Sequence, residues 1–184
     1  MPAAPVFLQE AARQQELLSF AILDTPAVQS YHAIVERLAE ECNVPMAAIS
    51  LVDAKRQWLK ASAGLVTRET PRSAAFCAYA ILGCEPLIVE DATQDSRFAD
   101  NPLVVGPPFI RFYAGVPLVS NRGFAIGALC ALDTKPRRLT RPQMRRMKWL
   151  AGRAMILLNI HKAVEQVAFD QSLEIRATAL RGRA

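Results

Sequence analysis

An apolar repeat near the C-terminus sets the length of one helix and, with it, the shapes that the chain can adopt. The repeat runs through about three heptads, marked by Met147, Ala154, His161 and Ala168 and, three positions later each time, by Leu150, Leu157 and Val164. A helix from Thr140 to Leu180 would be about 60 Å long at 1.5 Å per residue, more than the width of a domain of this size. Core packing explains the first half of the repeat, and a partner helix is the natural explanation for the rest.

A capping box and an unusual cluster of charge mark the start of this helix. Thr140 and Gln143 have the spacing at which each side chain bonds the backbone N–H of the other residue. The positive end of the helix dipole disfavours cations, yet five arginines surround this turn: Arg137, Arg138, Arg141, Arg145 and Arg146. We expect an acidic surface to face them, with Glu36, Glu40 and Glu41 as the candidates.

The length and composition are those of one soluble domain. A chain of 184 residues, 52% of them hydrophobic, suffices for one core with an appended helix. Its apolar runs are far shorter than the roughly 18 residues of a membrane span. The first residues, MPAAPVFLQEAARQQ, lack the basic start and apolar stretch of a secretory signal. We therefore expect a cytoplasmic protein with no membrane span.

The net charge of +5 is concentrated at one end of the chain. Residues 134–184 contain 12 Lys and Arg against 3 Asp and Glu, a net charge of +9, which leaves −4 for residues 1–133. A basic helix can face nucleic acid, anionic lipid or an acidic protein surface. No aromatic interleaving or helix-turn-helix pattern accompanies it, so we expect a solvated or partner-facing helix and no nucleic acid.

The cysteines and histidines do not have the spacing of a metal site. Cys42, Cys77, Cys84 and Cys130 form no C-x-x-C pair and have no nearby histidine. We expect no metal and interpret the cysteines as small buried hydrophobic residues, with redox chemistry left open.

The remaining pattern predicts an α+β fold. Hairpins and terminal helices favour an antiparallel sheet covered on both faces. A helix covers residues 8–22, and a second runs from an N-cap at Thr25 to Asn43. A short helix is expected at Ser73–Leu82. The expected strands are Met46–Val52, Arg56–Ala63, Pro86–Val89, Arg111–Ser120 and Phe124–Asp133.

The segment Asp91–Leu118 combines charged, amide, aromatic and proline residues between two expected strands. Its prolines forbid a long helix, so it is mostly loop. Its polar side chains can pair with one another, as in an ion pair of Asp91 with Arg97, or converge on a polar ligand. They are Asp91, Asp95, Arg97, Asp100, Asn101 and Arg111.

Several collinear motifs resemble the GAF sensory family, in the branch found at the N-termini of bacterial sensor histidine kinases and diguanylate cyclases. They are ILDTP at 22–26, SLVDAKRQWLKA at 50–61, RETPRSAAFCAYAIL at 68–82, VEDATQDSRFADNPLVVGPPFIRFYAGVPL at 89–118 and GALCALD at 127–133. The resemblance divides the chain into an N-terminal helical segment (1–24), a sensory domain (25–168) and an extension of the signalling helix (169–184). Where this branch usually has phenylalanine and histidine, the chain has Leu59 and Tyr79.

The resemblance implies a GAF-like central antiparallel sheet of about six strands. The terminal helices would lie on one face, and ligand-side helices and loops on the other would roof a pocket. On this basis the expected ligand-binding residues are Trp58, Phe76, Cys77, Tyr79, Asp91, Arg97, Phe98, Asp100, Asn101, Arg111, Tyr113 and Cys130. No catalytic residue and no particular cofactor is implied.

The leading hypothesis is a non-catalytic sensory module. A small molecule in the pocket, or the redox state of the chain, would act through the terminal helices on a partner in a homodimer, or on a histidine kinase or diguanylate cyclase as in two-component signalling. One alternative is an enzyme like free methionine sulfoxide reductase, because Cys77 and Cys84 lie seven apart and Cys130 could lie beneath them. The other is a ligand-free dimerisation scaffold.

Overall fold

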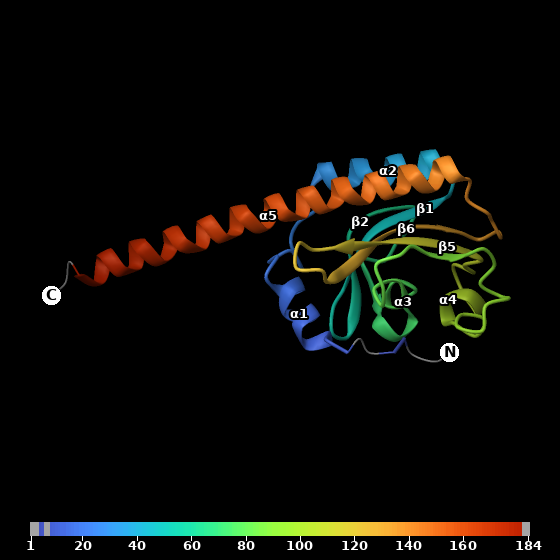
Figure 1. Ribbon diagram of the computed structural model, residues 1–184, viewed down its shortest axis with the longest axis horizontal. Helices are drawn as coiled ribbons and strands as arrows, with labels where there is room; N and C mark the ends of the chain where they lie inside the picture. The colour runs from blue at the N-terminus through green and yellow to red at the C-terminus, as the bar shows by residue number, and fades with distance from the viewer. Residues whose placement is uncertain (1–3, 6–7, 182–184) are drawn as a thin grey trace.

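A six-stranded antiparallel sheet forms the centre of the molecule, with strand order β3-β2-β1-β6-β5-β4 (Figure 1). The computed structural model describes residues 4–5 and 8–181, and their side chains as far as residue 174. Along the chain the elements are α1 (Glu10–Leu18), α2 (Gln29–Cys42), β1 (Met46–Val52), β2 (Arg56–Ala63), β3 (Glu69–Pro71), the 3-10 turn η1 (Arg72–Ala74), α3 (Cys77–Ala80), β4 (Leu87–Val89), α4 (Pro102–Val105), β5 (Phe112–Val119), β6 (Ala125–Asp133) and α5 (Arg141–Arg181). The predicted α+β fold is confirmed.

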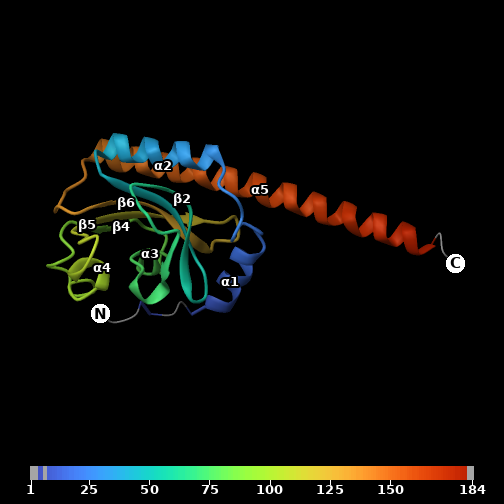
Figure 2. The same ribbon diagram turned by 180° about the vertical axis from the view of Figure 1, so that it is seen from behind.

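The two faces of the sheet are covered by different layers. Helices α2 and α5 lie on one, which we call the helix face, while α3 and α4 lie with long loops on the other, the cavity face (Figures 1 and 2). Side chains of β1 alternate between them. Ala47 and Ile49 join the core under α2 and α5, and Met46 and Ala48 join the core on the opposite side. One strand therefore contacts both layers.

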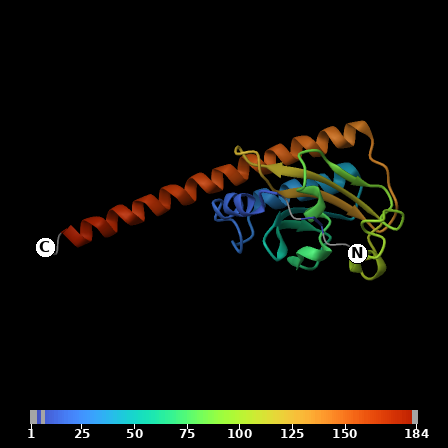
Figure 3. The same cartoon turned by 60° about the horizontal axis from the view of Figure 1, so that its bottom comes forward.

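Helix α5 is 41 residues long and extends well beyond the sheet (Figure 3). Met147, Leu150, Ala154 and Leu158 are buried against the helix face. Further along, Val164 is exposed, because no other part of the described chain covers the helix there. The predicted projecting helix is therefore confirmed, although residues 182–184 of the predicted extension lie outside the described residues.

The start of α5 has the predicted cap and an acidic neighbour. The Thr140 N–H donates to Gln143 Oε1 over 3.0 Å, and the Gln143 N–H donates to Thr140 Oγ1 over 3.3 Å. Arg146 donates to a carboxylate oxygen of Glu41 over 2.7 Å. Of the three glutamates proposed to face the arginines, Glu41 is the one that binds this side chain. Its contacts with Arg146 and Arg37 lower its pKa, although burial alone would raise it.

Three local predictions were wrong or incomplete. Helix α2 begins at Gln29 rather than after Thr25, because the Thr25 hydroxyl donates to the Ile22 carbonyl and accepts from Lys60 instead of capping. The helix expected over Ser73–Leu82 is divided into η1 and the four-residue α3. The short edge strand β3 was not predicted, since three residues are too few to show an alternating pattern.

Candidate functional site

A cavity of about 340 Å³ lies between the cavity face of the sheet and the loops that cover it. The floor consists of residues from β1, β2, β3, β5 and β6: Met46, Ala48, Gln57, Leu59, Thr70, Tyr113, Cys130 and Leu132. We call the covering layer the roof; it consists of residues 64–67, Phe76 and Cys77 where α3 begins, and Leu103, Pro107, Pro108 and Ile110. A cavity of this size and composition suits a small, mostly apolar molecule.

One polar atom of the floor has no partner among the described residues. Gln57 Nε2 donates to Thr70 Oγ1 over 3.3 Å, but Gln57 Oε1 is buried and accepts no hydrogen bond from them. A buried acceptor without a donor is unfavourable by roughly 1–3 kcal/mol. A ligand that carries one N–H or O–H group would satisfy it.

Stacked aromatic rings fix the position of α3 above the sheet. Phe76 stacks on Phe98 with ring centroids 4.3 Å apart and on Tyr113 at 5.1 Å. Tyr79 meets Phe98 edge-on at 4.9 Å. Of these four residues, only Phe76 and Tyr113 line the cavity. Phe98 is fully buried behind Phe76 and supports the wall from outside.

Asn101 and Arg111 hold the roof loops in place through backbone atoms. Asn101 Nδ2 donates to the Ala74 carbonyl over 3.0 Å, and its Oδ1 accepts from the Leu103 N–H over 2.8 Å. Arg111 donates to the Val104 carbonyl over 2.9 Å. Neither residue lines the cavity. Both instead form hydrogen bonds that position the roof loops.

The acidic residues and Arg97 of the same loop also lie outside the cavity. Arg97 donates to Asp95 over 2.6 Å, so the predicted ion pair of Asp91 with Arg97 is wrong. Asp91 instead accepts from the Thr93 N–H and hydroxyl. Each carboxylate bonds a group two residues away, which is how Asp stabilises a turn. Asp100 is exposed on the surface.

Trp58 lies on the other side of the sheet, in the core beneath the helices. Its neighbours Gln57 and Leu59 both line the cavity, because successive side chains of a strand point to opposite faces. The prediction from the sequence included Trp58 because it is aromatic, and it omitted Gln57 and Leu59. The alternation of side chains along the strand would have identified both. It also missed the apolar residues of 64–67 and 103–110, which have no regular pattern.

A group of sulfur and hydroxyl side chains lies where the sheet meets α3. The Tyr113 hydroxyl donates to Cys77 Sγ over 3.2 Å. Tyr113 can reach this point because its hydroxyl occupies the space that a side chain on Gly115 would take, and Gly115 pairs with Cys130 on β6. Cys77 and Cys130 are both buried and both line the cavity. Cys84 is exposed beyond the end of α3, so the two cysteines that lie seven apart in the sequence do not share a helix.

The two thiols of this group differ in acidity. Burial alone would raise the pKa of Cys77, but the neighbouring side chains of Cys130, Ser50 and Tyr113 lower it below its ordinary value. The pKa of Cys130 is raised well above the ordinary value by the neighbouring Cys77 side chain and by burial. Burial also raises the pKa of Tyr113. The Ser50 hydroxyl faces the Cys77 thiol as well, but it makes no hydrogen bond of normal geometry within the described residues.

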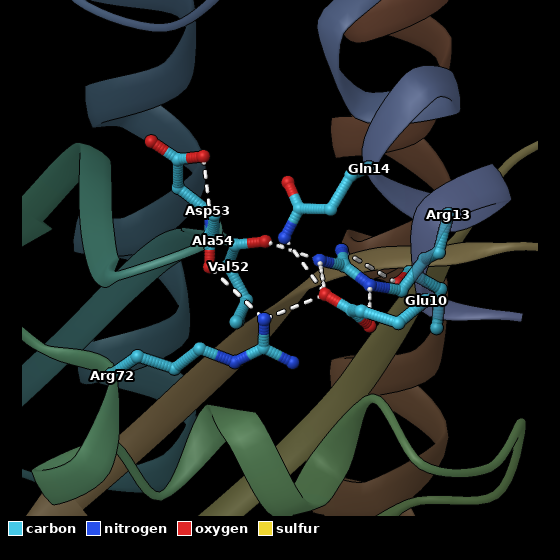
Figure 4. Close-up of polar contacts among 8 residues, drawn as sticks. Glu10, Arg13, Gln14, Val52, Asp53, Ala54 and Arg72 are labelled. Carbon is cyan, nitrogen blue, oxygen red and sulfur yellow. Dashed lines mark hydrogen bonds and ion pairs between the residues drawn. The ribbon is translucent and has the colours of Figure 1, made fainter. Parts of the chain in front are cut away.

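Helix α1 is joined to the strand ends and to η1 by a polar cluster of Glu10, Arg13 and Arg72, which we call the α1 clamp (Figure 4). Arg13 is 1% exposed; it pairs with Glu10 at 2.8 Å and donates to the Val52 carbonyl over 2.8 Å. Arg72, just ahead of α3, donates to the same Glu10 over 2.6 Å. Burial alone would raise the pKa of Glu10, but hydrogen bonds from Arg13, Arg72 and Gln14 lower it to about 2. The carboxylate therefore stays charged at neutral pH.

A second contact joins α1 to α5. Glu16 is 2% exposed and lies 3.4 Å from Lys162 Nζ, which also donates to Ser19 Oγ over 2.7 Å. Helix α1 therefore has direct polar contacts with η1 at one end and with the long helix at the other. Within the described residues no group of three His, Cys, Asp or Glu is arranged to hold a metal ion, and no helix is long and apolar enough to cross a membrane.

Comparison with known proteins relates this architecture to a family. A model of the GAF domain matches residues 27–158. A cyclic di-GMP phosphodiesterase of Pseudomonas aeruginosa is 44% identical over 137 residues, which are 74% of this chain and 23% of that protein. The chain thus spans less than a quarter of this relative's length.

Two solved structures have the same fold at low identity. The GAF domain from an Acinetobacter phosphoenolpyruvate-protein phosphotransferase has a TM-score of 0.61 and 18% identity, with 85% of this chain and 96% of that chain covered. The type II free methionine-R-sulfoxide reductase from Thermoplasma acidophilum has a TM-score of 0.60 and 16% identity, with 79% and 96% covered. At these identities the likeness concerns the fold alone.

The family match and the architecture agree in extent. Residues 27–158 run from just before α2 to Leu158, which is fully buried on the helix face and is the last such residue of α5 among the side chains that the structure describes. The matched segment therefore contains the six strands, the cavity, helix α2 and the first part of α5, which together cover the opposite face. The chain belongs to the GAF domain family.

Proposed function

We propose that the chain is a non-catalytic sensory module that binds a small, mostly apolar molecule in the cavity and transmits the bound state to α5. The observation that supports this most directly is the arrangement of β6 between the two layers. Cys130 and Leu132 line the cavity, while Leu129 and Ala131 belong to the core beneath α5. A small shift of this strand on ligand binding would change the packing on both faces of the sheet, because protein interiors are closely packed.

The ligand we propose has two chemical features. Its body is apolar and small enough for a cavity of about 340 Å³. It also carries one hydrogen-bond donor for Gln57 Oε1, the buried acceptor that no described residue bonds. No charged side chain is among the described residues that line the cavity, so a charged head group would be poorly solvated there.

We propose further that α5 pairs with the same helix of a second copy, as a homodimer. Apolar residues with heptad spacing follow its free face: Trp149, Ile156, Ile160, Ala163 and Val167. Ile156, Ile160 and Val167 are each more than half exposed. A stripe of this kind is self-complementary about a two-fold axis. The output would be a signalling enzyme, and the relative named a cyclic di-GMP phosphodiesterase supports an enzyme of cyclic di-GMP turnover.

A neutral fluorescent probe tests the ligand site. N-phenyl-1-naphthylamine is apolar, carries one N–H group, and has no charge to be attracted or repelled by the basic C-terminal region. We expect saturable binding to the wild-type protein and an affinity at least about tenfold weaker for Ala48→Phe, whose ring would occupy the cavity.

Val167→Glu is the control for binding outside the cavity, because Val167 lies on the projecting part of α5. We expect this variant to bind the probe as the wild type does and to sediment as a monomer. Equal binding by wild type and Ala48→Phe would contradict the ligand site and favour a ligand-free scaffold. Loss of probe binding in Val167→Glu would place the probe on the helix, and a dimeric Val167→Glu would contradict the pairing.

A further inference from the structure

Cys77 and Cys130 line the same cavity from two different layers. Cys77 begins α3 in the roof, and Cys130 lies in the middle of β6 in the floor. Both side chains are at most 2% exposed to bulk solvent, yet both border the cavity. A small reagent that enters the cavity can therefore reach the thiols, while larger reagents outside cannot.

The groups around Cys77 are suited to a reaction at sulfur. The Tyr113 hydroxyl points its hydrogen at Cys77 Sγ from 3.2 Å. Gly115 leaves the room for that hydroxyl, and Cys130 is the residue paired with Gly115. The Cys130 thiol lies 3.5 Å from the Ala48 carbonyl, the partner to which it donates. Two thiols and one proton donor thus meet at one end of the cavity.

We propose that Cys77 and Cys130 form a dithiol that a hydroperoxide converts to a disulfide, which ties the roof to the sheet. The Cys77 thiolate attacks one peroxide oxygen and the O–O bond breaks, giving a sulfenic acid at Cys77. Tyr113 is placed to donate a proton to the departing oxygen, which leaves as water when the oxidant is hydrogen peroxide. Cys130 then attacks the Cys77 sulfur, and a second water leaves as the S–S bond forms. Two thiols lose two electrons in all, and the peroxide gains them.

The Tyr113 hydroxyl donates to Cys77 Sγ and so stabilises a thiolate there. The neighbouring side chains lower the pKa of Cys77, whereas the contact with Cys77 and burial raise that of Cys130, which agrees with this order of steps. The thiolate is the nucleophile in such reactions, so Cys77 reacts first and Cys130 resolves the intermediate. The dithiol lies in the cavity that we propose as the ligand site. Its oxidation by a hydroperoxide does not require that the proposed apolar ligand binds there.

The test uses the full chain with Cys84→Ser, because Cys77 and Cys84 would otherwise share one tryptic peptide. The substitution replaces an exposed thiol with a hydroxyl of similar size, so this variant should fold normally. After reduction and brief treatment with hydrogen peroxide, we expect the intact mass to fall by two hydrogens. The peptides that contain Cys77 and Cys130 should then be recovered as one disulfide-linked pair.

Further variants separate the two roles. With Cys130→Ser added, dimedone should label Cys77 as a sulfenic acid, while Cys77→Ser should stop the reaction. Tyr113→Phe keeps the ring but removes the proton donor, and we expect disulfide formation to slow at least about tenfold. Absence of the mass loss in the Cys84→Ser chain, or a disulfide that contains Cys42, would overturn the inference.

Probe binding by the same reduced sample distinguishes the two proposals. If the probe binds and no disulfide forms, only the dithiol inference fails. If the disulfide forms and the probe does not bind, only the ligand site fails.

Discussion

Replacement of Arg13 by alanine is expected to lower the free energy of unfolding by about 3 kcal/mol. The guanidinium is 1% exposed and bonds both the Glu10 carboxylate and two strand carbonyls, those of Val52 and Ala125. Alanine would leave the carbonyls without a donor and open a void at the end of the sheet. The midpoint and slope of urea unfolding, followed by circular dichroism, measure the change.

Arg37→Ala is the matched control for this prediction. Arg37 also pairs with a glutamate three residues away on the same helix, Glu40, but it is 55% exposed. Its removal should change the free energy of unfolding by no more than about 0.5 kcal/mol. Similar losses for the two variants would show that α1 is not anchored through the clamp.

The second large effect concerns two adjacent alanines of β1 that receive the same substitution. Ala47→Phe is expected to cost about 3 kcal/mol, because Ala47 lies in the filled core between the sheet and the helices. Ala48→Phe is expected to change the free energy of unfolding by less than about 1 kcal/mol, because its ring enters the cavity. Thermal and urea unfolding of the two variants side by side provide the comparison.

This pair of variants tests the asymmetry of the sheet itself. Both alanines are fully buried, so loss of solvent exposure does not distinguish them. Only the space in front of each Cβ differs between the two faces. If Ala48→Phe were as damaging as Ala47→Phe, the cavity would be filled by side chains in solution, and the proposed ligand site would have to be abandoned.

The sheet and the long helix could be predicted because their signals are repeated along the chain. The strands β1 and β2 are continuous runs of seven and eight residues, and the apolar heptads of α5 continue past the edge of the sheet. Many residues contribute to each such pattern, so a single residue that departs from it does not change the predicted element. Short elements such as β3 and α3 have only three or four residues and depend on tertiary contacts instead.

The candidate site was harder to predict because its polar residues have several possible partners. In the loop around Asp91, the charges indicated pairing but not which pairs, and Arg97 bonds Asp95 two residues away. Asn101 donates to the backbone carbonyl of Ala74, 27 residues away, and Arg13 in the α1 clamp donates to that of Val52, 39 residues away. A hydrogen bond to a backbone carbonyl cannot be predicted from a sequence pattern, because every residue has a carbonyl and the residue type does not identify the acceptor.

Hydrogen–deuterium exchange with and without N-phenyl-1-naphthylamine tests most directly whether the cavity and α5 are coupled. We expect slower exchange in the roof and also in the part of α5 between Met147 and Leu158, which packs on the opposite face of the sheet. Ala48→Phe should show neither change. Slower exchange in the roof alone, with saturating probe and an unchanged α5, would contradict the claim that this module transmits the state of its cavity to the long helix.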